Sequence, residues 1–321
     1  MTRPVLEAQH LSKRFPIMRG FLRRTVAELR AVEDVSFAIY PGDTLCVVGE
    51  SGCGKSTLGK LVLRLLEPSA GRILIEGEDV TAISPEAMRP YRRRVQMVFQ
   101  DPYASLNPRL SAAEIVTEPI ENFRPLTAAA RREQAAELLS RVGLRPDMLG
   151  RMPFEFSGGQ RQRLGIARAL SVQPALIVAD EPVSALDVSV QAQVLNLMMD
   201  LQETFGLAYL FISHDLGVVE HIGQRIAVMY LGRIVELADR DALFAAPQHP
   251  YSEALLAAAP LPDPRARRVR PIVEGEVPSP LDPPSGCTFH PRCPYAVARC
   301  REEVPALRKL ADGRLAACHL R

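Results

Sequence analysis

Apolar and polar residues alternate most clearly over residues 31–48, which end in a continuous apolar run at 45–48. Alternation with a period of two is typical of a half-buried strand, and a short uninterrupted apolar run is typical of a fully buried one. A Pro-Gly-Asp sequence at 41–43 supplies turn residues between the two parts. The pattern therefore predicts two strands here, the second of them inside a sheet.

Farther along the chain, helical and strand patterns follow one another. Helical composition and spacing predict helices over residues 55–66, 127–142, 160–171 and 191–204. Apolar runs predict strands over residues 72–76, 95–99, 175–179 and 207–212, and a hairpin over 225–237. Strands that alternate with helices predict a layered α/β fold with a mostly parallel sheet.

Proline becomes dense from about residue 246, with ten prolines between 247 and 284. Proline lacks a backbone N–H and fixes φ, so this segment is not expected to continue the sheet or to form long helices. We therefore expect one α/β domain over residues 1–245 and a separate proline-rich and cysteine-rich module over residues 246–321.

Charge and hydropathy limit the classes of partner. The 39 basic and 37 acidic residues nearly cancel, so the overall charge does not indicate a nucleic-acid partner. No apolar stretch reaches the roughly 18–20 residues that span a bilayer, and the N-terminus lacks the apolar core of a secretory signal. We expect a cytosolic chain that reaches a membrane only through a partner.

A glycine-rich segment at 49–57 fits the pattern G-x-x-x-x-G-K-[ST] between a predicted buried strand and a predicted helix. Its glycines allow backbone N–H groups to surround phosphate oxygens, the lysine supplies a cation, and the following hydroxyl suits Mg²⁺. The alternative, a glycine-rich turn with a surface lysine, is disfavoured by the flanking elements. The nucleotide-binding candidates are Gly49, Glu50, Ser51, Gly52, Cys53, Gly54, Lys55, Ser56 and Thr57.

Two adjacent acids, Asp180 and Glu181, follow the apolar run at 175–179. A carboxylate at the end of a buried strand is costly unless it faces a cation or solvent. Asp180 is therefore a candidate for Mg²⁺ and Glu181 for the general base that polarises an attacking water. Two acids at a strand end are more often simply solvated, but the phosphate loop upstream favours the functional interpretation.

Residues 156–160, Phe-Ser-Gly-Gly-Gln, resemble the signature motif of ABC-type ATPases. In that family the usual residue at the position of Phe156 is leucine. The resemblance implies a P-loop ATPase core with a mixed sheet and a helical subdomain at about 101–165. It also implies a head-to-tail dimer, in which ATP lies between the phosphate loop of one subunit and the signature of the other. The signature candidates for nucleotide binding are Ser157, Gly158, Gly159 and Gln160.

Other positions resemble the family in the same order along the chain. Gln100 resembles the glutamine that senses Mg²⁺ and the nucleophilic water, and Asp187 lies in a Ser-Ala-Leu-Asp sequence that resembles the loop crossing the dimer interface. His214 resembles the switch histidine at the γ-phosphate. The resemblance suggests that Phe15 stacks on adenine, with Tyr40 as a competing aromatic and the core as an alternative place for Phe15.

Residues 101–108 and the His-Pro-Tyr-Ser sequence at 249–252 are similar to the ATPase subunits of oligopeptide and dipeptide importers. This similarity implies two integral membrane permeases, a second ATPase subunit, identical or related, and an extracytoplasmic peptide-binding protein. It implies no nucleic-acid partner and a peripheral position on the cytoplasmic face of the inner membrane. Related importers carry nickel, oligosaccharides or glutathione, so the cargo stays open.

Four cysteines lie in the last 35 positions, at Cys287, Cys293, Cys300 and Cys318. Disulfides are rare in the cytosol, and four thiolates suit either tetrahedral zinc or an iron–sulfur cluster. The short Cys-x₂-Cys knuckles of structural zinc sites are absent. The resemblance to peptide-importer ATPases favours a [4Fe–4S] centre, with Zn²⁺ and free thiols as alternatives.

One alternative belongs to another functional class, the soluble ABC ATPases that act on ribosomes or DNA. Those proteins tend to carry two cassettes in one chain or long coiled-coil insertions. This chain has a single signature about a hundred residues after Lys55 and no space for a coiled coil. The sequence therefore favours a transporter subunit.

Overall fold

A computed structural model describes residues 3–19, 24–258 and 275–321. By internal contacts the chain divides into two compact units, which we describe separately. Among the described residues, the first unit comprises 3–5, 39–43 and 82–212, and the second comprises 6–19, 24–38, 44–81, 213–258 and 275–321. In these ranges no helix is both long and apolar enough to cross a bilayer.

The first unit contains three neighbouring parallel strands, β6 (Val95–Val98), β7 (Leu176–Asp180) and β8 (Ala208–Ile212), with β7 in the middle. Every residue of β7 and β8 is buried. Their continuous apolar sequences match this position, because parallel strands are covered on both faces. The three strands predicted from these runs are confirmed.

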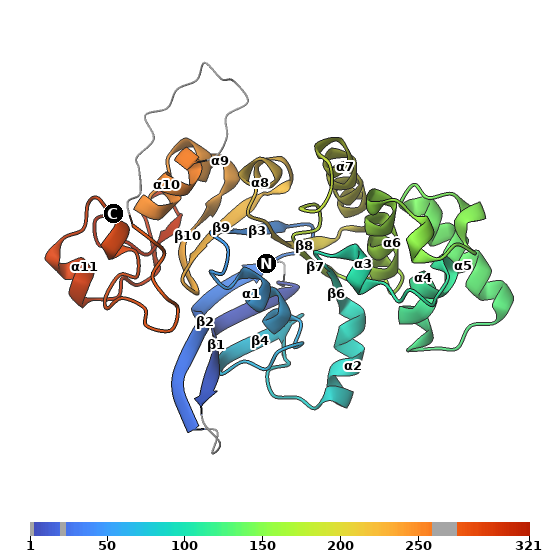
Figure 1. The fold of residues 1–321 in the computed structure, drawn as a ribbon, viewed down its shortest axis with the longest axis horizontal. Helices are drawn as coiled ribbons and strands as arrows, with labels where there is room; N and C mark the ends of the chain where they lie inside the picture. The colour runs from blue at the N-terminus through green and yellow to red at the C-terminus, as the bar shows by residue number, and fades with distance from the viewer. Residues whose placement is uncertain (1–2, 20–23, 259–274) are drawn as a thin grey trace. The chain divides into compact units, whose positions relative to one another are not determined.

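The helices of the first unit begin at recognisable caps. Ser111 and Glu114 form a capping box, and the Thr127 side chain accepts the N–H of Ala130. Three of the helices, α4, α5 and α6, pack against one another, as Figure 1 shows in green. The helices are α2 (Pro85–Arg94), α3 (Pro102–Ser105), α4 (Ala112–Glu121), α5 (Ala128–Arg141), α6 (Gly158–Leu170) and α7 (Val188–Phe205).

The second unit contains a four-stranded sheet in the order β2-β1-β4-β5 (Figure 1, blue). In β1 the apolar residues Leu6, Ala8 and Leu11 are buried. β1 pairs antiparallel with β4, and the register is irregular between Gln9 and Ser12. The strands are β1 (Leu6–Arg19), β2 (Arg24–Ile39), β4 (Ala70–Ile75) and β5 (Glu78–Asp79).

The second unit also contains a mixed run of strands in the order β11-β12-β10-β9-β3. β3 is parallel to β9, whereas β9 and β10 form the predicted antiparallel hairpin and β12 pairs antiparallel with β10. The strands are β3 (Thr44–Val48), β9 (Arg225–Tyr230), β10 (Arg233–Asp239), β11 (Arg308–Lys309) and β12 (Leu315–Ala316). The accompanying helices are α1 (Lys55–Val62), α8 (Leu216–Ile222) and α9 (Arg240–Ala245).

The chain beyond residue 246 belongs to the second unit wherever it is described. Its first helix is α10 (Pro250–Ala258), which begins with Pro250, a position where no intrahelical N–H is required. We call residues 275–321 the C-terminal segment. It contains η3 (His290–Arg292), α11 (Ala298–Glu302), β11 and β12. The domain boundary between residues 245 and 246 stays a prediction.

Candidate nucleotide site

The phosphate loop joins β3 to α1 in the second unit, as the sequence pattern predicted. Gly54 precedes α1 with φ of 106°, and a Cβ at this position would lie 2.0 Å from the carbonyl oxygen of Ala31. A side chain is therefore excluded both by the backbone conformation and by the close approach of Ala31. Gly49 is similarly confined, because its Cβ would lie 2.1 Å from the carbonyl oxygen of Met229.

Lys55 lies inside this loop and is only 5% exposed. Its Nζ donates to the carbonyl oxygens of Gly49 at 2.8 Å and Glu50 at 3.0 Å, and it lies 3.8 Å from the sulfur of Cys53. Burial raises the pKa of the Cys53 thiol, and the charge of Lys55 opposes that shift. The ammonium therefore sits among loop carbonyls, where its charge is available to an anion bound by the loop.

The candidate acids lie at the carboxyl end of β7 in the first unit. Asp180 is the last residue of the strand and is 5% exposed. Glu181 follows with φ of 46°, an uncommon conformation for a residue other than glycine. The Nε2 of Gln100 donates to Oε2 of Glu181 at 2.8 Å, so the structure brings two of the predicted catalytic residues together.

The Ser-Gly-Gly-Gln sequence begins α6, also in the first unit. Ser157 Oγ accepts the N–H of Gln160, and Gln160 Oε1 accepts the N–H of Ser157 at 3.0 Å. A Cβ on Gly159 would lie 2.4 Å from Cγ1 of Val190, so only glycine fits there. Ser157 and Gln160 therefore have a capping role, which the S-x-x-Q spacing could have indicated.

The remaining candidates lie on surfaces of the two units. His214 is exposed in the second unit, directly after Ser213, whose N–H donates to the carbonyl of Val47 in β3 at 3.2 Å. Asp187 is exposed at the start of α7 in the first unit and makes no side-chain cap hydrogen bond. Ser213 thus places His214 beside the strand that leads into the phosphate loop.

The two aromatic candidates for the adenine base lie in different units. Phe15 is half-buried in β1 of the second unit, and the Nζ of Lys13 lies 5.1 Å from its ring centroid. Tyr40 is 42% exposed in the first unit. Phe15 is thus neither fully buried nor fully exposed, and its stacking on adenine stays a prediction.

Sequence reasoning missed a set of contacts to Glu50, the second residue of the loop. The Nη1 and Nη2 atoms of Arg292 donate to the two carboxylate oxygens of Glu50 at 3.0 and 3.2 Å. The N–H of Glu50 donates to the hydroxyl oxygen of Tyr251 at 2.9 Å. All three residues belong to the second unit. The His-Pro-Tyr sequence marked Tyr251, but no local pattern could have paired it with a residue 201 positions earlier.

The four cysteines of the C-terminal segment lie within electrostatic range of one another. The N–H of Cys287 donates to the carbonyl of Cys300 at 2.8 Å. Burial raises the pKa of the Cys287 thiol to about 11, and Cys300, Cys293 and Cys318 add to that shift. Among residues 3–19, 24–258 and 275–321, however, no three His, Cys, Asp or Glu residues are arranged to hold a metal. The four thiols as described therefore do not form a ready site for a single metal ion.

Comparisons with known proteins agree with this combination of features. Residues 32–184 match the family described as ABC transporter, and residues 235–300 match the family described as oligopeptide/dipeptide transporter, C-terminal region. The probable peptide ABC transporter ATP-binding protein y4tS of Sinorhizobium fredii is 62% identical over 100% of this chain and 91% of its own length.

The oligopeptide transport ATP-binding protein AppF of Bacillus subtilis is 52% identical over 98% of this chain and 97% of its own length. Among solved structures, the ATP-binding cassette MJ0796, in a dimeric post-hydrolysis state with ADP and Pi, has a TM-score of 0.65 and 28% identity. That match covers 73% of this chain and 98% of the cassette.

The phosphate loop between a buried strand and a helix, together with the Ser-Gly-Gly-Gln helix start, defines the class of ABC-type ATPases, and the chain has their α/β fold. More narrowly, the chain belongs to the ABC transporter family and carries the C-terminal region of its oligopeptide/dipeptide branch. The resemblance noted in the sequence is therefore confirmed.

Proposed function

We propose that the chain is the ATP-hydrolysing subunit of an importer that carries di- and oligopeptides across the cytoplasmic membrane. The observation that carries the proposal is the oligopeptide/dipeptide transporter C-terminal region at residues 235–300, following an ABC phosphate loop on the same chain. Full-length similarity to proteins named for peptide transport supports the same cargo class.

In this proposal the phosphate loop binds the nucleotide phosphates through its backbone N–H groups. Lys55 exchanges part of its bonding to the Gly49 and Glu50 carbonyls for the β/γ-phosphate oxygens, where its charge offsets theirs. The Ser56 hydroxyl, Asp180 and Gln100 are suitable Mg²⁺ or Mg²⁺-water ligands by their oxygen chemistry. Bound Mg²⁺ would neutralise charge on the transferred phosphoryl group.

Glu181 has the role of general base in this proposal. Gln100 donates to one of its carboxylate oxygens, which restricts the orientation of the carboxylate. The unusual backbone conformation of Glu181 supports a functional role, because strained conformations are concentrated at active sites. Positioning of this kind supplies most of the catalysis in phosphoryl transfer.

The proposed working unit contains a second ATPase subunit. The helix start at Ser157–Gln160 offers backbone N–H groups and a helix dipole to the nucleotide of the partner cassette, and Asp187 would face the same interface. His214 would contact the γ-phosphate. Two integral membrane permeases and an extracytoplasmic peptide-binding protein complete the importer, with this chain on the cytoplasmic face of the inner membrane.

A [4Fe–4S] centre on Cys287, Cys293, Cys300 and Cys318, with Zn²⁺ as its alternative, is a separate proposal. The number of thiols and their closeness in sequence support it, whereas their described arrangement does not, so no step of the mechanism depends on it. Iron, zinc and labile-sulfide analysis of protein purified without oxygen tests it. Stoichiometric iron and sulfide would support the cluster. Metal-free protein in which the thiols of Cys287, Cys293, Cys300 and Cys318 are all free would overturn it.

The transport proposal is tested by uptake of a radiolabelled tripeptide into cells that lack the chain. We expect the wild-type chain to restore uptake and the Glu181→Gln variant, at equal protein level, not to restore it. Nickel, oligosaccharide and glutathione uptake are measured in the same strains. Restoration of one of these in place of peptide uptake would assign a different cargo, and absence of ATP hydrolysis by the purified wild-type chain would contradict the enzymatic part.

A further inference from the structure

Glu50 is held at both its side chain and its backbone by residues from the far end of the chain. Arg292 binds its carboxylate through two nitrogens, and Tyr251 accepts its backbone N–H. Bidentate guanidinium–carboxylate pairs fix the relative orientation of the two groups as well as their distance. Arg292 and Tyr251, which we call the anchor residues, therefore define the direction of the first peptide units of the phosphate loop.

Contacts other than the one to Glu50 also restrict the side chain of Arg292. Its side chain is 10% exposed, and its guanidinium carbon lies 5.9 Å from the ring centroids of both Tyr230 and Phe289. The two rings are fully buried and meet edge to face, with centroids 5.3 Å apart. Because these rings restrict the side chain, Arg292 loses little conformational freedom when it binds Glu50.

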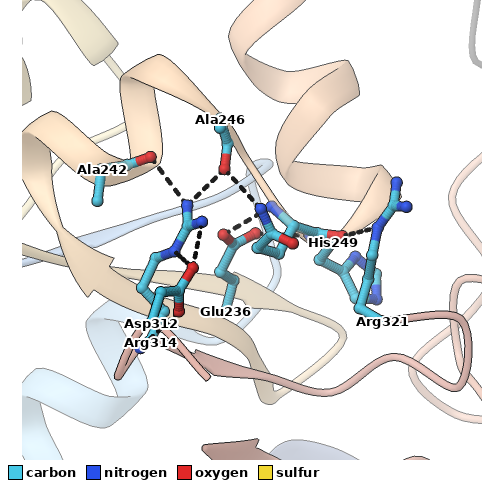
Figure 2. A network of polar contacts seen from close by, with 8 residues as sticks. Glu236, Ala242, Ala246, His249, Asp312, Arg314 and Arg321 are labelled. Atoms are coloured by element: carbon cyan, nitrogen blue, oxygen red, sulfur yellow. Dashed lines mark hydrogen bonds and ion pairs between the residues drawn. The ribbon is translucent and has the colours of Figure 1, made fainter. Parts of the chain in front are cut away.

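Tyr251 is fixed by a series of hydrogen bonds that starts at β10. The carboxylate of Glu236, fully buried, accepts the N–H groups of Gln248 and His249, both at 2.8 Å (Figure 2). His249 Nδ1 in turn accepts the N–H of Tyr251 at 3.0 Å. The buried carboxylate of Glu236 thus positions His249, and His249 positions Tyr251, whose hydroxyl contacts the phosphate loop.

The end of the chain stabilises the same region. Arg321 donates through Nε to the carbonyl of Gln248 at 3.0 Å, and Arg314 donates to the carbonyls of Ala242 and Ala246 (Figure 2). Arg314 also pairs with Asp312. These contacts fasten the C-terminal segment to the chain that leads into His249.

The anchor residues act on the peptide units that Lys55 also uses. Lys55 donates to the carbonyls of Gly49 and Glu50, so the position of Glu50 helps to set the position of the Lys55 ammonium. A loop that is already ordered loses less entropy when it binds its ligand. Removing a contact of Arg292 or Tyr251 with Glu50 should therefore weaken nucleotide binding, although neither of these two side chains is placed on the nucleotide.

We propose that Arg292 and Tyr251 are positioning residues for the phosphate loop, so that the chain beyond residue 246 sets the affinity of the protein for ATP. This inference rests on the proposed function only in that the loop binds a nucleotide. It assigns a role in nucleotide binding to the His-Pro-Tyr sequence and to the C-terminal segment.

The first test measures the Kd for Mg²⁺-ATP by titration calorimetry, using the purified full chain and Arg292→Met. We expect binding to weaken about five- to tenfold, which lies within the range of coupling between residues in contact. Arg299→Met is the matched control, because it removes an exposed pair with Glu303 in the same segment. An Arg292→Met Kd equal to wild type, or an equal loss in Arg299→Met, would overturn the inference.

A second measurement separates positioning from general destabilisation. Hydrogen exchange of peptides covering residues 49–56 is compared in wild type, Arg292→Met, Glu50→Gln and the double variant. We expect faster exchange there in each single variant, no further increase in the double variant, and partial recovery in Arg292→Lys. Additive effects would overturn the inference, as would unchanged exchange in Glu50→Gln, which leaves the C-terminal segment intact. If wild type itself fails to bind ATP, the proposed function is wrong instead.

Discussion

The phosphate loop is a glycine-rich turn before α1, whereas the glycines of the Ser157–Gln160 sequence form the first turn of α6, and the residues that hold the two regions differ. The phosphate loop is held by Arg292 and Tyr251, more than 200 positions away in sequence. The α6 start is held by a reciprocal bond between Ser157 and Gln160, three positions apart. The first arrangement ties a ligand-binding loop to distant structure, whereas the second is complete within one helical turn.

This difference predicts how each region responds to substitution. A locally capped turn should tolerate change elsewhere in the chain and respond mainly to loss of its own cap. A loop tied to distant residues should respond to changes in several parts of the second unit. The following substitutions compare the two kinds of support.

The largest effect is expected from Glu181→Gln. Removing a general base lowers the rate by about 10²–10⁴, while the phosphate loop and its anchor residues are unchanged, so ATP binding should persist. Steady-state hydrolysis and calorimetric binding measured together check this. Hydrolysis within about threefold of wild type would remove Glu181 from the catalytic role.

A somewhat smaller effect is expected from Gly54→Ala. The new Cβ would collide with the Ala31 carbonyl at a backbone conformation unfavourable for alanine, which should cost about 3 kcal/mol in the free energy of unfolding. Gly52→Ala is the control, because φ there is 78° but no atom lies within 4 Å of the added Cβ. Urea unfolding of both variants should show a clearly larger loss for Gly54→Ala, and equal losses would contradict the packing argument.

Acid should lower the free energy of unfolding, because protonation of His249 disfavours its buried position next to Tyr251. Burial lowers the pKa of His249 to about 3, below its ordinary value of 6.5, among Phe289, Tyr251 and the Glu236 carboxylate. The unfolded chain therefore binds more protons between these values, and stability falls as pH decreases from 6.5 toward 3. We expect a loss of about 2 kcal/mol by pH 5.

The measurement is the free energy of unfolding between pH 7 and pH 5 for wild type and His249→Gln. The variant should be less stable at pH 7 and should show a shallower decrease with acid. A pH dependence identical to wild type would mean that other groups account for the acid sensitivity.

The smallest effect is expected from Ser157→Ala. Loss of the cap should reduce the free energy of unfolding by about 1 kcal/mol. Nucleotide binding by the isolated chain should be unchanged, because the phosphate loop has separate support. Urea unfolding and ATP titration check both parts, and a large loss of ATP affinity in the isolated chain would contradict the separation of the two regions.

The elements with continuous local signals could be predicted from the sequence. The apolar runs of β3, β7 and β8, and the phosphate loop between β3 and α1, follow from patterns a few residues long. The pairing of Gln100 with Glu181 was partly accessible, because both residues follow strands whose carboxyl ends meet at one edge.

Other elements were missed because their local signals conflict. α4 has a capping box at Ser111 but also contains Pro119, which argues against a helix. β1 contains Pro16, which argues against a long strand. In both cases tertiary packing overcomes the local preference, and Ile115 and Leu11, for example, are buried.

The contacts at Glu50 could not have been predicted from sequence in any detail. The carboxylate at the second position of the phosphate loop carries no local sign of a partner, and Arg292 is one of many arginines. Only the fold brings η3 to the loop within the second unit. The same holds for β11 and β12, which are two residues each. β12 pairs with β10, and β11 pairs with β12, only because the chain returns to this edge.

The separation of Glu50 from Arg292 also has a consequence for protein synthesis. The two residues are 242 positions apart, so the ribosome adds Arg292 about 10–50 s after Glu50 at typical elongation rates. During that interval the phosphate loop exists without its partner arginine, and a prematurely terminated chain never acquires it. With the positioning role proposed above, a chain truncated before Arg292 would bind ATP less tightly than the finished chain.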